Sequence, residues 1–126
     1  MKITRFEDLE VWQQARELTR STYRLTANSK FAKDYGLKDQ MRRASVSIMA
    51  NVAEGFSRKG DKEFGQFLFV AKSSAAELQS HVYVALDQGY IGEAEFRKLY
   101  DSLDHISRMT SNLIKHLSAR PTQQTP

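Results

Sequence analysis

Three histidines, His81, His105 and His116, are the side chains best suited to bind a metal or move a proton near neutral pH. No two are four residues apart, the spacing that places two imidazoles on one helical face for a metal. Asp101 and Asp104 share one side of a predicted helix with His105, but the paired Glu-x-x-His pattern of di-iron bundles is absent. We therefore expect no metal site and no cofactor.

Other catalytic patterns are equally lacking in the sequence. Some all-helical ribonucleases place an arginine a few residues before a histidine, whereas seven residues separate Arg97 from His105 and Arg108 from His116. There is no cysteine for thiolate chemistry, no Walker loop and no Gly-x-Ser-x-Gly turn. We expect the protein not to be an enzyme.

The basic residues have a more suggestive spacing. Arg16, Arg20 and Arg24 stand at i, i+4 and i+8, which predicts one row along a helix, with Glu17 on a different sector. Such a row suits phosphate contacts, which need no base to be read and weaken with salt. The residues predicted to bind nucleic acid are Arg16, Arg20, Arg24, Lys30, Lys33, Lys38, Arg42, Arg58, Lys59 and Lys62.

The positive charge is concentrated in the first half of the chain. The net charge is +4, but residues 1–60 hold 12 basic and 7 acidic side chains while residues 61–126 hold 7 and 8. This asymmetry favours a polyanionic partner, either RNA or DNA. The alternative is an adaptor whose basic face docks an acidic protein without nucleic acid.

The 126 residues contain two prolines and six glycines, so long helices can run between the glycines. We predict helices near 7–26, 36–57, 61–88 and 92–118, with Asp61 capping the third and Gly89 ending it. Short connections predict an antiparallel up-down four-helix bundle over 5–118, followed by a disordered tail at 119–126. With no signal peptide or membrane segment visible, we expect a cytoplasmic protein.

The helix expected over 92–118 has the clearest pattern. Apolar residues from Phe96 to Leu117 alternate at spacings of three and four, which predicts one buried face. Its other side offers opposite charges four residues apart, Arg97 with Asp101 and Asp104 with Arg108. This helix is expected to form an outer wall of the bundle.

The two middle helices carry more apolar surface than one bundle can bury. Residues 44–53 hold no charge, and Phe69, Ala76 and Tyr83 form a second stripe opposite the core stripe of their helix. We therefore predict homo-oligomerisation, although a small bundle can also tolerate scattered surface aromatics. Glu54 and Glu77 are expected to be buried, the latter among Val70, Val84 and small residues of its helix. Arg43 is therefore expected to form a structural ion pair with one of them. The predicted interface residues are Val46, Met49, Ala50, Ala53, Phe69, Ala76 and Tyr83.

Three blocks of the sequence, over 9–15, 35–55 and 67–78, include Leu-Glu-Val-Trp, Arg-Arg-Ala and Ala-Glu-Gly. In these blocks the chain resembles the 23S ribosomal RNA intervening-sequence protein family, which is itself similar to the accessory variability protein of diversity-generating retroelements. The resemblance implies four antiparallel helices in a homopentameric ring. It also implies a nucleic-acid-associated role without established catalysis, and a reverse transcriptase as a possible protein partner.

Overall fold

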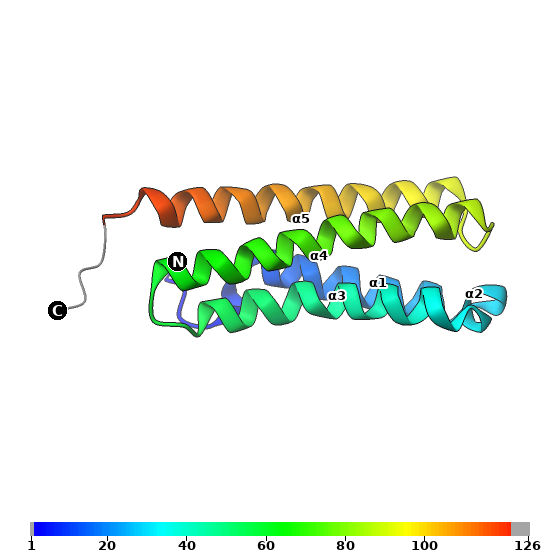
Figure 1. Cartoon of the computed structure of the whole chain (residues 1–126), viewed down its shortest axis with the longest axis horizontal. Helices are drawn as coiled ribbons and strands as arrows, with labels where there is room; N and C mark the ends of the chain where they lie inside the picture. The colour runs from blue at the N-terminus through cyan, green and yellow to red at the C-terminus, as the bar shows by residue number, and fades with distance from the viewer. Residues whose placement is uncertain (1, 122–126) are drawn as a thin grey trace.

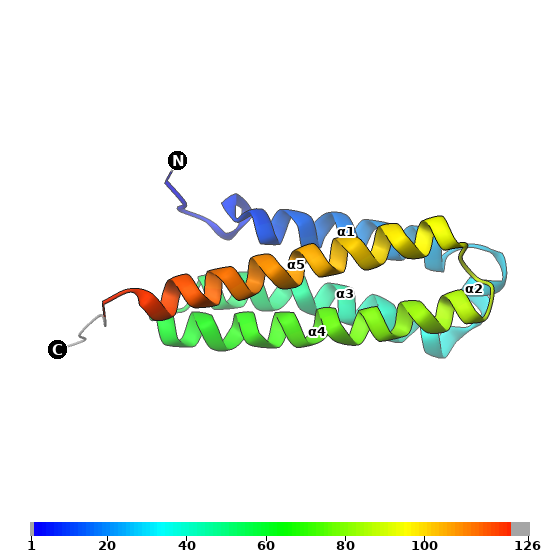
Figure 2. The same ribbon diagram turned by 90° about the horizontal axis from the view of Figure 1, so that it is seen from above.

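The structure is a computed structural model that describes residues 2–121, and every regular element within them is a helix. Four long helices lie side by side along one axis (Figures 1 and 2). The all-helical class is thereby confirmed. The elements are η1 (Phe6–Asp8), α1 (Glu10–Thr26), α2 (Ser29–Lys33), α3 (Tyr35–Phe56), α4 (Asp61–Asp87) and α5 (Glu93–Ala119).

The long helices fall close to the ranges expected from glycine spacing. α3, α4 and α5 begin and end within one residue of the expected ranges, while the first range divides into the single turn η1 and then α1. Ala119 still belongs to α5. Residues 122–126 of the expected disordered tail lie outside the described residues.

The bundle core comes from all four long helices. α3 packs against α4, α4 against α5, and α1 against both α3 and α5. Figure 1 shows the chain turning back between α3 and α4 at one end and between α4 and α5 at the other. The stripe predicted on α5 is buried, including Phe96, Leu103 and Thr110, except at Leu113, which is half-buried. Both predicted charge pairs on its outer side are present, with Arg97 3.8 Å from Asp101 and Arg108 3.4 Å from Asp104.

The segment 27–35, expected to be a plain loop, contains the short helix α2. Its Phe31 is buried and stacks on the ring of Tyr90, with centroids 4.9 Å apart. The Tyr90 hydroxyl donates a 2.9 Å hydrogen bond to Asp34, whose other carboxylate oxygen accepts from the Leu37 amide and caps α3. The hydrogen bond to the Asp34 carboxylate raises the pKa of Tyr90. The buried ring of Phe31 therefore packs the segment 27–35 against the turn between α4 and α5.

Of the two caps predicted for α4, the one at Gly89 is confirmed and the one at Asp61 is wrong. Gly89 has a positive φ of 73°, and the Tyr90 amide beyond it donates to the Ala85 carbonyl, which ends the helix as predicted. Asp61 is not the N-cap, which is Gly60. The Asp61 carboxylate instead forms an ion pair of 3.2 Å with Arg120 at the end of α5. A contact with a distant helix has replaced the local cap.

α3 and α4 approach each other closely near their connection. A Cβ atom on Gly55 would lie 2.7 Å from the Phe67 Cβ and 2.9 Å from the Phe64 ring. Further along the pair, the Ser47 and Ser74 hydroxyls are 2.9 Å apart and form a hydrogen bond. Only small side chains fit along this contact, so Gly55 is needed for its size.

Gly55→Ala should therefore destabilise the protein. The added methyl group must push against the Cβ of Phe67, and overpacking of this kind costs about 1–3 kcal/mol in the free energy of unfolding. Urea denaturation at one fixed protein concentration measures the change. The matched control is Gly65→Ala on α4, where nothing lies within 4 Å of the new methyl and helix propensity predicts a gain of roughly 0.5–1 kcal/mol. Equal effects of the two substitutions would contradict the close-contact account.

Candidate functional site

The predicted basic row lies on the exposed side of α1. Arg16, Arg20 and Arg24 are all exposed. The Arg16 guanidinium lies 5.9 Å above the ring centre of Trp12, and Arg24 donates to the Ser21 hydroxyl. Arg20 forms an exposed ion pair of 3.3 Å with Glu17, which sequence spacing had placed on another sector. Because both partners are more than half exposed, water screens this pair and the row keeps most of its positive field.

The next four predicted residues extend the basic surface to the α2 end of the bundle. Lys30 and Lys33 are exposed on α2, whereas Lys38 and Arg42 are half-buried on α3. The Lys38 ammonium lies 4.9 Å from the ring centre of Tyr35.

Arg42 is bound to α1 rather than free in solvent. Its Nε donates a 2.8 Å hydrogen bond to the Thr26 hydroxyl, a second nitrogen donates to the Tyr23 carbonyl, and the guanidinium lies 4.4 Å above the Tyr23 ring. Arg42 therefore joins α3 to α1, with one side of its plane covered by Tyr23. Together these seven residues form what we call the basic face: Arg16, Arg20, Arg24, Lys30, Lys33, Lys38 and Arg42.

The remaining three predicted residues lie elsewhere. Arg58, Lys59 and Lys62 are exposed around the α3–α4 turn, at the end of the molecule away from α2 (Figure 1). Arg58 pairs with Glu54 at 3.1 Å and lies 5.0 Å from the Phe67 ring centre. The structure thus divides the predicted set into the basic face and a second cluster at the opposite end.

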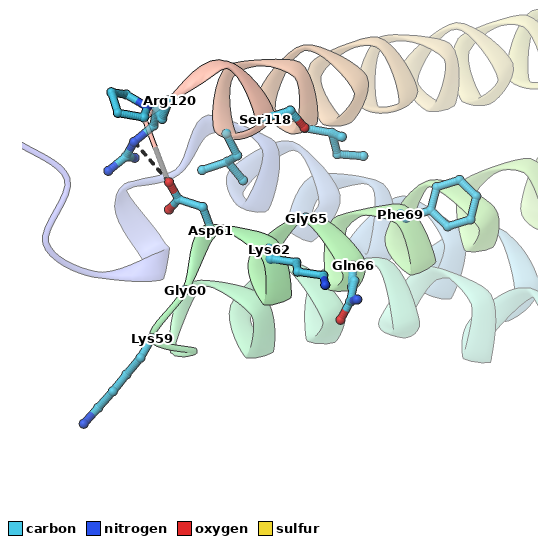
Figure 3. A pocket seen from close by; sticks show the side chains of 12 residues that line it. Lys59, Gly60, Asp61, Lys62, Gly65, Gln66, Phe69, Ser118 and Arg120 are labelled. Atoms are coloured by element: carbon cyan, nitrogen blue, oxygen red, sulfur yellow. Dashed lines mark ion pairs between the residues drawn. The ribbon is translucent and has the colours of Figure 1, made fainter. Parts of the chain in front are cut away.

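A cavity of about 850 Å³ lies beside this second cluster, between the start of α4 and the end of α5. Figure 3 shows the Asp61–Arg120 ion pair closing one side of it, while Lys59 extends away from the helices. Phe69 and Leu117 contribute apolar surface to the lining. Its charged lining residues include Lys62 besides the Asp61–Arg120 pair.

The predicted ion pair between Arg43 and Glu54 or Glu77 is absent from the described residues, so this prediction is wrong. Glu54 and Glu77 are exposed, and their partners are Arg58 at 3.1 Å and His81 at 3.3 Å. Arg43 is exposed and forms no ion pair within the described residues. Helical neighbours four residues away satisfy the two carboxylates, so no buried charge requires Arg43.

The predicted oligomer interface residues differ in exposure. Val46, Ala50, Phe69, Ala76 and Tyr83 are exposed. Met49 and Ala53 are half-buried, and Met49 packs against the core.

Two further exposed valines, Val70 and Val84, lie on α4. Val70 precedes Glu77 by seven residues and Val84 follows it by seven, so all three share one side of α4. The sequence analysis predicted that this side is buried. We call the exposed residues Val46, Ala50, Phe69, Val70, Ala76, Tyr83 and Val84 the apolar face.

Tyr23 and Tyr35 were missed as candidate site residues. Their rings are 42% and 68% exposed, and each lies against a cation of the basic face. The available signal was the interleaving of tyrosines with lysines and arginines over 20–42.

Glu77 and His81 lie 3.3 Å apart, but they belong to no larger cluster of acidic and histidine side chains in the described part of the chain. Within the part of the chain that the structure describes, no group of three or more His, Asp or Glu residues could hold a metal ion. Asp101 and Asp104 each lie beside an arginine. None of the described helices has the length and apolar composition needed to cross a membrane.

Comparison with known proteins identifies the family and the fold. A solved structure of a protein of unknown function from the S23 ribosomal protein family, from Bacteroides thetaiotaomicron VPI-5482, is similar with a TM-score of 0.76 and 20% identity. The match covers 83% of this chain and 98% of that chain, and at this identity it shows the fold alone. No curated protein matches. The family model for the 23S rRNA-intervening sequence protein matches residues 7–112, so the chain belongs to that family.

Proposed function

We propose that this protein is a non-catalytic, homo-oligomeric scaffold that binds RNA or DNA through phosphate contacts of the basic face. The observation that carries the proposal is the exposed row of Arg16, Arg20 and Arg24, which continues into Lys30 and Lys33 of α2. Within the described residues, the ion pair that opposes the charge of this row is the exposed one between Arg20 and Glu17. A row of cations on one helix matches a run of phosphates without reading bases.

The family description names an intervening sequence of 23S rRNA, which makes RNA a natural first ligand to examine. Phosphates are common to RNA and DNA, so the basic face alone does not favour one of them. Resemblance to the accessory variability protein supports the same kind of nucleic-acid-associated role. The adaptor function, in which the basic face docks an acidic protein such as a reverse transcriptase, is an outcome of the binding test below.

Reversing the charge of the row should weaken binding. The triple substitution Arg16→Glu, Arg20→Glu and Arg24→Glu removes three cationic contacts, and the affinity for a mixed-sequence RNA or DNA hairpin should fall at least tenfold at low salt. Fluorescence anisotropy across a salt series measures both affinity and slope. On a DNA duplex, each lost phosphate contact should flatten the log–log slope by about 0.9.

A charge-matched control separates the row from net charge. Arg97→Glu, Arg108→Glu and Lys115→Glu change the total charge by the same amount, but all three lie on α5, and the two arginines lie beside carboxylates there. This variant should bind much more tightly than the α1 variant. Equal losses would place the contacts elsewhere, and no binding of either hairpin by the wild type at low salt would favour the adaptor.

We further propose that the helices form an antiparallel up-down bundle that assembles through the apolar face, as a homopentamer. Phe69 is 62% exposed and Tyr83 49% exposed on α4, and Val46 adds apolar surface from α3. Exposed apolar patches that continue over two helices are typical of interfaces. The accessory variability protein, a pentameric ring, supports the number five by resemblance. A second copy of the chain is the simplest partner, because the face is mostly uncharged.

Phe69→Lys should prevent assembly. A charge placed on the apolar face would be buried without a partner in the assembly, so the mass measured by light scattering should fall from pentamer toward monomer. Tyr35→Lys is the control, since Tyr35 is equally exposed but lies outside the apolar face; its mass should stay that of the wild type. A monomeric wild type would overturn the assembly proposal.

A further inference from the structure

The α2 end of the basic face carries two aromatic rings that the bundle does not use. Tyr35 is 68% exposed and Tyr23 is 42% exposed, and neither belongs to the hydrophobic core or to the residues packed against it. By contrast, Tyr90 and Tyr100 are half-buried and pack against that core. A large ring left in water beside a cluster of cations needs a reason other than folding.

Each exposed ring already has a cation on it. The Lys38 ammonium lies 4.9 Å from the Tyr35 centre, and the Arg42 guanidinium lies 4.4 Å from the Tyr23 centre. Arg42 is held there by its hydrogen bonds to Thr26 and to the Tyr23 carbonyl, so this stacked pair is organised before any ligand arrives. Arginine planes and tyrosine rings are both surfaces on which unpaired bases stack.

A shallow hollow of about 640 Å³ lies over the Tyr23–Arg42 pair. Its other lining residues include Asp39 and Arg43, which place one acidic and one further basic group around the stack. The carboxylate of Asp39 would repel a phosphate but can accept a hydrogen bond from a base amino group. The hollow therefore offers a base both a stacking surface and a hydrogen-bond acceptor, while Arg42 and Arg43 offer cations to a neighbouring phosphate.

Tyr35 and Arg42 lie seven residues apart on α3, which is about 10 Å along one side of the helix. Lys30 and Lys33 lie on α2, which packs against α3, and Arg20 and Arg24 lie on α1 beside Tyr23. Cations for the backbone and rings for the bases thus occur together at one end of the molecule. In a duplex the base faces are already stacked, so they are not available to Tyr35 and Tyr23.

We infer that the basic face binds single-stranded nucleic acid in preference to duplex, with unpaired bases stacking on Tyr35 and on the Tyr23–Arg42 pair. This inference rests on the proposed function. It goes further by assigning the two tyrosines as ligand-contacting residues and the unpaired strand as the ligand. Single-stranded RNA and single-stranded DNA offer the same base faces, so they are separate arms of the test.

The experiment compares short mixed-sequence single strands of RNA and of DNA with the corresponding duplexes, using the full chain and fluorescence anisotropy. The wild type should bind at least one single strand about tenfold or more tightly than its duplex. Tyr35→Leu and Tyr23→Leu should each weaken single-strand binding by roughly tenfold, since stacking on one aromatic ring contributes 1–3 kcal/mol per base. Duplex affinity and the salt dependence should stay unchanged, because the phosphate contacts remain.

Tyr35→Phe and Tyr23→Phe are the matched controls, because phenylalanine keeps the ring and removes only the hydroxyl. Both should retain the preference for single strands. Circular dichroism of Tyr23→Leu checks that the contact with Arg42 is not needed for folding, and Tyr35→Leu tests the inference independently at a more exposed site.

The outcomes distinguish failure of the stacking inference from failure of the proposed phosphate-binding function. If hairpins bind and the α1 charge reversal weakens them, but Tyr35→Leu and Tyr23→Leu leave single-strand affinity unchanged, the stacking inference fails and the phosphate-binding function stands. If no single strand, hairpin or duplex binds at low salt, both fail. A tyrosine-dependent preference for either RNA or DNA single strands supports the inference and also identifies the ligand.

Discussion

The close contact between α3 and α4 is the constraint on which the rest of the structure depends. Gly55 leaves room for Phe67 and Phe64, and Ser47 and Ser74 meet across the pair at 2.9 Å. Small residues at such a contact let two helix backbones approach closely, but they contribute little apolar area of their own. The larger side chains of both helices must then point either into the core or outward. Leu68, Leu78 and Val82 take the first course, and Phe69 and Val70 take the second. The half-exposed ring of Tyr83 lies against Phe96 and Tyr100 of α5.

This arrangement explains why the middle of the sequence is uncharged without being fully buried. Ala50 and Val46 of α3 are exposed, as are the α4 residues of the apolar face, although nothing in their composition distinguishes them from core residues. Periodicity correctly predicted the buried side of α5, because that helix has charged residues opposite its apolar stripe. On α3 and α4 both sides are apolar or small, so the pattern alone could not say which side faces the core. Glu77 was expected to be buried for this reason and is exposed.

The limits of sequence reasoning at the basic face have a different physical origin. The i, i+4 spacing was sufficient to place Arg16, Arg20 and Arg24 in one exposed row. Spacing could not predict that Arg42 donates to Thr26, sixteen residues away, because that contact depends on how α1 and α3 pack. The same holds for α2, where burial of Phe31 against Tyr90 gives helical structure to a segment that reads as a loop. Contacts between distant residues were not predicted, whereas two ion pairs within one helix, both on α5, were predicted.

The two faces meet on α3, where Val46 of the apolar face lines the same hollow as Tyr23 and Arg42. Ser47 forms a hydrogen bond with Ser74 of α4, and Arg42 donates one to Thr26 of α1. The exposed surface of α3 lies between these two sides of the helix. The apolar face continues from α3 onto α4, and the basic face continues from α3 onto α1 and α2. A partner that covers α4 would therefore leave the α1 arginines in water. In a closed assembly of identical copies, each copy would then present its own row of cations, and one long polyanion could engage several rows at once. Weak, unspecific phosphate contacts of one subunit would then add to a strong total affinity, which would be the physical advantage of the proposed assembly.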